Sequence, residues 1–159
     1  MIMATPTGDA AALAWLPRLL QTTDSMFPTG AYAHSFGLEG VVQDGSVRDT
    51  ASFDNFLTNQ IVPSLRQLEL PCTMHAYRAV QADDFQTFCE LDQQYSALKG
   101  AHELREASAR TGRQRLALLK KIAPHENEWW KKMDAACRTG ELDAHDVIVM
   151  GAQGARTGI

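Results

Sequence analysis

The chain has 159 residues, of which 45% are hydrophobic, and its formal net charge is -4 at pH 7. This length suits one globular domain with a hydrophobic core, spanning residues 1–159, and leaves too little chain for a second. The negative charge argues against a dedicated nucleic-acid-binding protein, which usually carries a concentrated positive excess.

Helical periodicity begins near the N-terminus, and no alternation typical of β-strands is found along the chain. Asp9 is suited to cap a first helix, whose apolar face is formed by Leu13, Leu16, Leu19 and Leu20. The segment 24–30 contains Pro28 and Gly30 and predicts a turn. A second helix, rich in small residues, is expected from Ala31 to Gln43.

Prolines divide the middle of the chain into separate predicted helices. Asp49 and Thr50 resemble the cap of a third helix, with Pro63 near its end. Pro71 is expected in the first turn of a fourth helix, and a fifth opens at Asp83 or Asp84 and closes at Gly100. The apolar positions assigned to these three helices are Phe53, Phe56, Leu57, Ile61, Met74, Tyr77, Ala79, Phe85, Phe88, Leu91, Tyr95 and Leu98.

The longest predicted helix runs from about His102 to Ile122. Its expected inner stripe consists of Leu104, Ala107, Thr111, Leu118 and Ile122. Pro124 separates it from a helix through Trp129 and Trp130, which Gly140 stops; one indole is expected in the core and the other partly exposed. A last helix begins near His145 and continues to the chain end without a predicted cap. The sequence therefore predicts an all-α bundle of about seven or eight helices with short connections.

The familiar enzyme motifs are absent from the sequence. It contains neither a Walker-type phosphate-binding loop nor a nucleophile elbow around any serine. His34, Ser35 and Glu39 superficially resemble a catalytic triad, but neighbouring side chains on a helix point about 100° apart. A small helical hydrolase that uses His34 and Ser35 is therefore kept only as an alternative.

The metal-ligating residue types are scattered. None of the five histidines lies four residues from another, so neither a tight metal site nor a cofactor is expected. Three distant cysteines indicate reduced, buried thiols, and the apolar run Ala10–Leu20 is too short to span a bilayer, so a soluble cytoplasmic protein without membrane contact is expected. Five basic residues without an acidic neighbour predict a solvated helix face, in preference to a docking surface for an acidic protein: Arg110, Arg113, Arg115, Lys120 and Lys121.

The most unusual segment runs from Asp24 to Glu39 and reads DSMFPTGAYAHSFGLE. On a helix, Gly30, Ala33 and Gly37 would form a side small enough for another helix to approach closely. Tyr32 and Glu39 fall on another side, together with Ser35 or Phe36, where their polar tips suit a partner surface. A tightly packed helix pair explains the same residues equally well.

This segment resembles the signature of the F-type urease accessory proteins. Counterparts are present at every fixed position, namely Asp24, Ser25, Phe27, Pro28, Gly30, Tyr32, His34, Ser35, Gly37, Leu38 and Glu39. A second family-like block covers residues 103–108 with Gly112, and a third, weaker one runs from His145 through Gly151 to Ile159. Family members continue for several helices beyond this region, so the chain is expected to be a C-terminally short F-type domain.

The resemblance implies a non-catalytic helical scaffold for inserting nickel into urease. Such a scaffold dimerises and binds the D/H-type accessory protein, and together they recruit the G-type GTPase that delivers nickel to the urease apoprotein. The residues implied in partner binding are Tyr32, His34, Ser35, Glu39 and Arg105. Arg105 either supplies charge in trans to the GTPase or forms a buried salt bridge. A helical adaptor unrelated to nickel is the remaining alternative.

Overall fold

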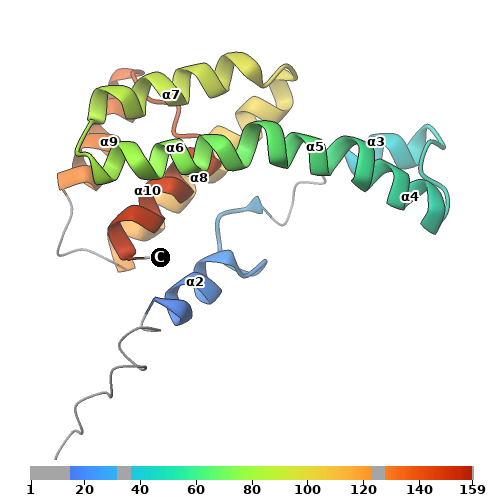
Figure 1. Cartoon of the computed structure of the whole chain (residues 1–159), viewed down its shortest axis with the longest axis horizontal. Coiled ribbons are helices and arrows are strands. Elements are labelled where there is room, and N and C mark those ends of the chain that lie inside the picture. Colours follow the sequence, from blue (N-terminus) through green and yellow to red (C-terminus); the bar gives the residue numbers. More distant parts are fainter. Residues whose placement is uncertain (1–14, 32–36, 123–127, 159) are drawn as a thin grey trace, which may run out of the picture.

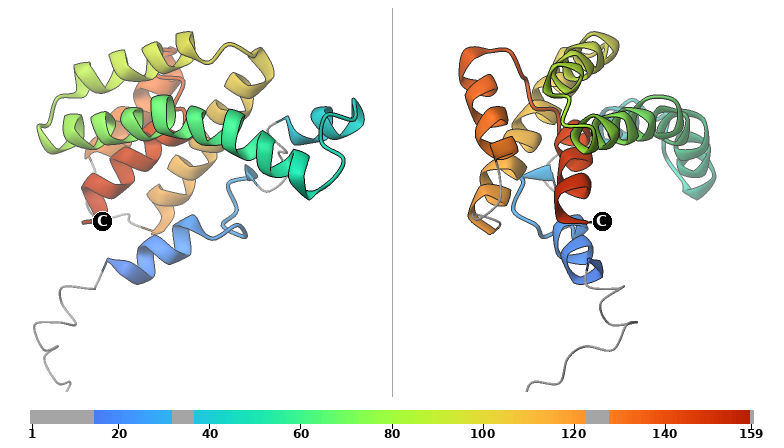
Figure 2. Two further views of the ribbon diagram at one scale, coloured as in Figure 1. Left: turned by 45° about the vertical axis from the view of Figure 1, so that its right-hand side comes forward. Right: turned by 60° about the vertical axis from the view of Figure 1, so that its left-hand side comes forward.

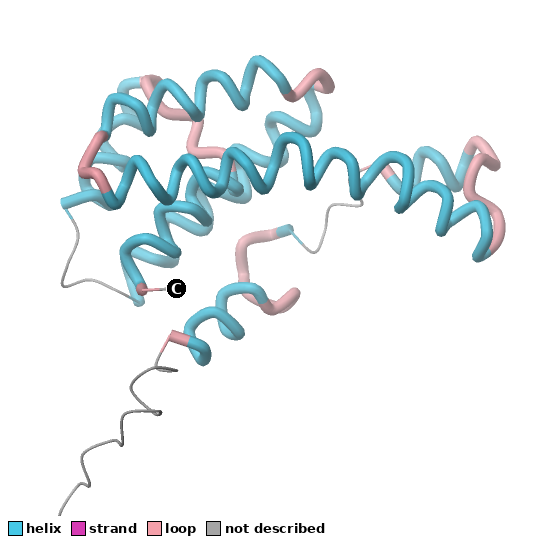
Figure 3. Tube along the Cα trace, in the orientation of Figure 1, coloured by secondary structure: helices cyan, strands magenta, loops and turns pink. Residues whose placement is uncertain are grey.

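The computed structural model describes residues 15–31, 37–122 and 128–158, and every regular element in these ranges is helical (Figures 1 and 3). The all-α prediction is confirmed. If the continuous helix from residue 50 to residue 81 is counted once, the described ranges hold seven helical bodies, as predicted. The elements are α2 (Leu16–Thr23), α3 (Leu38–Gln43), α4 (Thr50–Phe56), η2 (Leu57–Ile61), α5 (Val62–Ser64), η3 (Leu65–Glu69), α6 (Leu70–Gln81), α7 (Phe85–Leu98), α8 (His102–Ile122), α9 (Glu128–Thr139) and α10 (Asp146–Thr157).

Residues 50–81, here called the long helix, are helical without interruption, so the predicted boundary between a third and a fourth helix is wrong. Each internal proline lies two residues after the end of a π-helical segment. The N–H of Val62, before Pro63, donates to the carbonyl of Leu57, and that of Leu70, before Pro71, donates to Leu65. In an α-helix the proline ring clashes with the carbonyl four residues earlier. The wider π turns relieve that clash, and the helix continues.

The core lies where α10 packs between α6 and α8 (Figure 2). Ile148, Val149 and Ala152 of α10 are fully buried there. The α7 and α9 helices cover another side of the core, where Trp129 packs edge to face on Phe88 with ring centroids 5.4 Å apart. The core therefore combines the long helix with all four helices that follow it.

Two glycines allow helices to approach the backbone of their neighbours. A Cβ on Gly112 of α8 would collide with the carbonyl of Ala144 and the amide of Asp146. A Cβ on Gly151 of α10 would collide with the carbonyl of Thr73 on α6. Gly112 belongs to the second family-like block and Gly151 to the third. At these two positions the blocks therefore contain glycine because helices pack closely around α10.

Helix ends are partly as expected. Asp49 caps α4 through the N–H of Ser52, whose hydroxyl in turn accepts from the N–H of Asp49. The predicted helix from Ala31 to Gln43 does not run through Gly37, which has a φ of +96° and precedes α3. The prediction of an uncapped last helix is also wrong, because Gly158, at φ +73°, caps α10. The first-helix positions Asp9 and Leu13 lie outside the described residues.

The predicted burial pattern needs several corrections. Trp129 and Trp130 are both buried, at 2% and 3% exposure, so neither indole is a surface anchor. Ile122 and Leu98 are exposed, as are Phe53 and Met74 on the long helix. In α8, Ala107 and Thr111 are buried as predicted, but the buried leucines are Leu116 and Leu119 in place of Leu118.

The cysteines are free thiols, as predicted; Cys72 and Cys89 are buried and Cys137 is half-buried. Burial raises the pKa of the Cys89 thiol to about 12. In the part of the chain that the structure describes, no helix has both the length and the apolar character needed to cross a membrane.

Candidate partner-binding site

A cleft of about 440 Å³ lies between α3, the long helix and the start of α8. It brings two family-like blocks together, since Gly37 of the first block and Leu104 of the second both line it. Much of one wall comes from the π-helical part of the long helix, where π turns often occur at functional sites. The lining residues are Gly37, Val41, Phe56, Gln60, Ile61, Ser64, Leu65, Glu69, Lys99 and Leu104.

An ion pair lies among these lining residues. The Lys99 ammonium is 3.3 Å from the carboxylate of Glu69 and donates to the Tyr95 hydroxyl at 2.9 Å. Burial disfavours the charged ammonium, but the hydrogen bond to Tyr95 and the negative charge of Glu69 outweigh it and raise the pKa of Lys99. The cleft therefore presents apolar walls beside a charged pair that is held in place.

Arg105 supports this corner of the cleft. Its guanidinium donates to the carbonyls of Lys99 and Gly100 at 2.7 and 2.8 Å. These two carbonyls follow the end of α7, where helix carbonyls lack intrahelical partners. The described contacts of Arg105 are therefore with the backbone, in place of the carboxylate expected for a buried salt bridge.

The other predicted site residues are placed only in part. Tyr32, His34 and Ser35 lie outside the described residues. Glu39 lies in the first turn of α3 and is exposed. No contact joins Glu39 to Arg105, although both belong to described parts of the chain. Their roles in partner binding stay predictions.

A buried polar network on α8 and α10 was missed by the sequence reasoning. Arg115, predicted to lie on a solvated face, is buried and pairs with Asp146 at 2.7 Å. It also donates to the backbone carbonyl of Thr22 at 3.0 Å and to the side-chain oxygen of Gln153 at 3.4 Å. The signal was available, because Arg115 lies four residues after Thr111 on the expected inner stripe.

Two further members of the basic cluster also have partners within the fold. Lys120 pairs with Asp134 at 2.9 Å, and Arg113 donates to the carbonyl of Asp143 at 2.9 Å. The first contact ties α8 to α9, and the second ties α8 to the loop before α10. The prediction of a solvated face is therefore wrong for Arg115. Arg113 and Lys120 also make contacts that join α8 to other parts of the chain.

Asp92 is another buried polar residue that the sequence reasoning missed, and unlike Arg115 it has no sequence signal. Its carboxylate accepts the backbone N–H groups of Asp143, Ala144 and His145 at 2.7, 3.1 and 2.9 Å. Burial raises the pKa of Asp92 to about 6, against these hydrogen bonds, which lower it. The bonds hold the loop before α10 in a conformation where Ala144 has a φ of +59°, a region that residues other than glycine rarely adopt.

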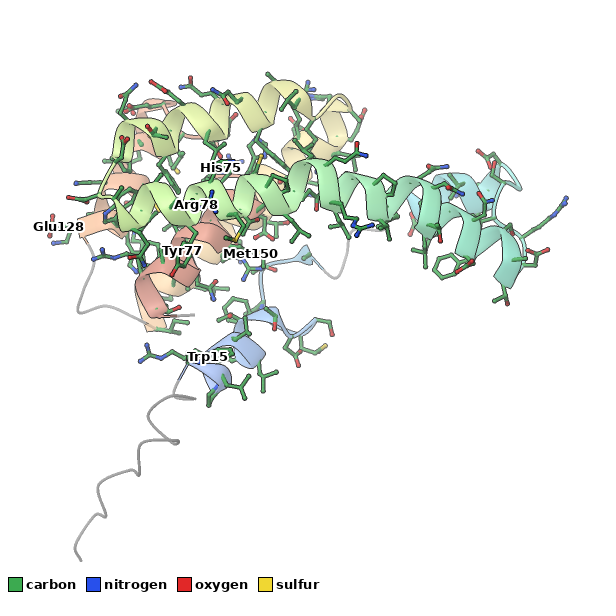
Figure 4. All side chains as sticks on the ribbon, viewed as in Figure 1. Trp15, His75, Tyr77, Arg78, Glu128 and Met150 are labelled. Atoms are coloured by element: carbon green, nitrogen blue, oxygen red, sulfur yellow. The ribbon has the colours of Figure 1, made fainter. Side chains whose placement is uncertain are left out.

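A second hollow, of about 430 Å³, follows the groove between α6 and α7 and is flanked by His75 and Arg78, labelled in Figure 4. It contains no residue of the three family-like blocks, so the cleft between α3, the long helix and α8 is the stronger candidate for the partner-binding site. Among the described residues, no cluster of three His, Cys, Asp or Glu side chains is arranged to hold a metal ion.

Comparison with known proteins gives a consistent result. The UreF family model matches residues 47–159. The chain is 34% identical over 106 residues to the urease accessory protein UreF of Nostoc sp., a match that covers 67% of this chain and 46% of the relative. For UreF of Lachnoclostridium phytofermentans the identity is 38% over 107 residues, and the match covers 67% of this chain and 46% of the relative. For UreF of Kocuria rhizophila the identity is 29% over 140 residues, and the match covers 88% of this chain and 58% of the relative. The chain thus spans about half the length of the curated relatives it matches.

Proposed function

Because this chain belongs to the UreF family of urease accessory proteins, we propose that it acts in urease maturation as a non-catalytic scaffold for nickel insertion. In this role it works as a dimer in the cytoplasm and binds the D/H-type accessory protein. The two proteins recruit the G-type GTPase, and the assembly delivers nickel to the urease apoprotein. Modulation of the GTPase activity belongs to the same proposal.

The observation that carries the proposal is the cleft in which two family-like blocks meet. Its walls combine apolar side chains, including Val41 and Leu65, with the Glu69–Lys99 pair. Protein interfaces bind through apolar anchors that enter such pockets beside a few placed polar groups. The cleft therefore fits a partner that inserts an apolar side chain next to a polar or charged group.

The two alternatives are weaker. His34 and Ser35 lie outside the described residues, so no geometry supports a hydrolase. Membership of the family argues against an adaptor unrelated to nickel.

A pair of substitutions on one helix tests the cleft. Leu65 and Val62 are 39% and 41% exposed, but only Leu65 lines the cleft. We expect Leu65→Lys to weaken binding of the D/H-type accessory protein at least about tenfold, because it places a charge in the apolar wall. Val62→Lys should bind as the wild type does. Affinity is measured by titration calorimetry with the purified partner, and circular dichroism verifies that each variant is folded.

Two results would contradict this assignment. Wild-type affinity of the Leu65→Lys variant would remove the cleft from the interface. Absence of binding by the unsubstituted chain would argue against the scaffold role itself.

A further inference from the structure

The N-terminal part of the described chain lies beside the bundle and contacts it through few side chains. In Figures 1 and 2, α2 and the segment after it are separate from the layer formed by α6, α8 and α10. Leu20 and Met26 are exposed, whereas Thr22 and Thr29 are buried. We call residues 22–31 the N-terminal turn; it includes the described beginning of the first family-like block.

The buried network of Arg115 joins this turn to the bundle. The guanidinium donates to the Thr22 carbonyl and lies over the Phe27 ring, with its carbon 5.7 Å from the ring centroid. The Gln153 amide donates to the Thr22 hydroxyl at 2.6 Å. Side chains of α8 and α10 thus hold both the backbone and the side chain of the turn.

The chemistry of this network requires arginine. One planar guanidinium serves Asp146 through Nε and Nη2 and serves Thr22 and Gln153 through Nη1. A lysine ammonium is a point charge on a flexible stem and does not reproduce this fork. If the turn moved away, Arg115 would lose its bond to Thr22 and the ring of Phe27, so docking of the turn and satisfaction of the buried charge are coupled.

We propose that Arg115 is a positioning residue that fixes the N-terminal turn on the bundle. It thereby sets the place from which the remainder of the first family-like block departs. The positioning stands on the network alone, whereas its consequence for partner binding rests on the function proposed above.

Neighbouring threonines provide a matched test of the positioning. Thr22→Val removes the hydroxyl that accepts from Gln153 and leaves that buried amide without this partner. Thr23→Val changes an adjacent, exposed hydroxyl that donates only within α2, to the Leu19 carbonyl. Hydrogen exchange of the isolated chain, followed by mass spectrometry, should show about tenfold faster exchange over residues 19–31 for Thr22→Val. Peptides from α7 and α9 should be unchanged, and Thr23→Val should match the wild type.

The arginine is tested in the same way. Arg115→Lys should also accelerate exchange over residues 19–31 about tenfold, whereas Arg113→Lys, at an exposed position of the same helix, should not. Binding of the D/H-type accessory protein, measured where circular dichroism shows both variants to be fully folded, should weaken for Arg115→Lys and not for Arg113→Lys. Such a loss of affinity in a folded chain is not expected from a purely structural arginine.

Three outcomes overturn the proposal. The first is equal exchange of the two threonine variants over residues 19–31. The second is uniform acceleration over the whole chain in Thr22→Val, which would show a general loss of stability. The third is wild-type exchange over residues 19–31 in Arg115→Lys, whereas unchanged partner affinity of that variant would refute only the consequence for partner binding. Exchange is measured without any partner, so a wild-type chain that fails to bind would refute the proposed function and leave the positioning result standing.

Discussion

Asp92 and His145 meet at the loop that joins α9 to α10, and burial shifts their pKa values in opposite directions. His145 is fully buried, packs on the Tyr95 ring at 4.9 Å, and neither ring nitrogen has a hydrogen-bond partner among the described residues. Burial lowers the pKa of His145 to about 4, although the nearby Asp143 carboxylate raises it. Burial raises the pKa of Asp92 to about 6. At neutral pH the imidazole is neutral and the carboxylate is ionised.

These shifts have opposite effects on stability as the pH falls. The unfolded chain protonates His145 first, near its ordinary pKa of 6.5, so acidification from about 6.5 to 4 destabilises the fold through this group. The folded chain protonates Asp92 first, so acidification from about 6 to 3.8 stabilises the fold through that group. In the wild type the two contributions largely offset each other.

Replacing the histidine should expose the contribution of Asp92. The His145→Phe variant keeps the ring packing on Tyr95. We expect its unfolding free energy, minus that of the wild type, to be about 2 kcal/mol higher at pH 5 than at pH 7. Urea unfolding at the two pH values measures this difference. Parallel pH dependences of variant and wild type would show that His145 does not titrate as its burial requires.

Buried charges were the residues that the sequence reasoning missed. Arg115 and Asp92 lie in helices that were located correctly, and their types alone favour solvent exposure. Their burial depends on partners far along the chain, Thr22 for Arg115 and the loop 143–145 for Asp92. The periodic positions of α8 were the available indication for Arg115, and no comparable pattern marked Asp92.

Among the elements, helix type and number were predictable because apolar spacing and caps act locally. The α8 helix begins and ends at the predicted residues, and Asp49 caps α4 as expected. The long helix was not predictable, because a proline normally ends an α-helix and the π turns before Pro63 and Pro71 have no simple sequence signature. The π-helical residues that line the cleft were missed for the same reason.

The contact between α10 and α6 depends on the absence of a side chain at Gly151. We expect Gly151→Ala to lower the unfolding free energy by about 2 kcal/mol, because the added methyl meets the Thr73 carbonyl and the Ala76 side chain. Gly40→Ala in α3 is the control, since a methyl group added there would have no neighbour within 4 Å and alanine favours a helix. Chemical unfolding measures both variants. A Gly151→Ala variant as stable as Gly40→Ala would mean that α10 can shift without cost.

At the scale of the whole molecule, stability is unevenly distributed. Residues 37–64, here called the arm, extend away from the core in Figure 1, and only Val47 and Phe56 are buried within them. The α6 to α10 region, in contrast, contains nearly all of the buried apolar cluster. One wall of the cleft belongs to the arm and another to α8, so motion of the arm changes the width of the cleft.

Hydrogen exchange should therefore proceed in two stages. Amides of residues 50–64 are expected to exchange at least about tenfold faster than those of residues 107–119, because local opening of the arm exposes little apolar surface. Native-state exchange at increasing urea concentration measures the opening free energies. Equal opening free energies in the two segments would show that arm and core unfold as one unit.

The central place of α10 also has a consequence for the order in which the protein is made. The helix that fills the space between α6 and α8 is the last of the described elements to be synthesised. The hydrogen bonds that Asp92 accepts from residues 143–145 likewise form only after more than fifty further residues have been added. During translation the apolar faces of α6 and α8 therefore stay uncovered until α10 has emerged from the ribosome, and over this interval the nascent chain is vulnerable to aggregation.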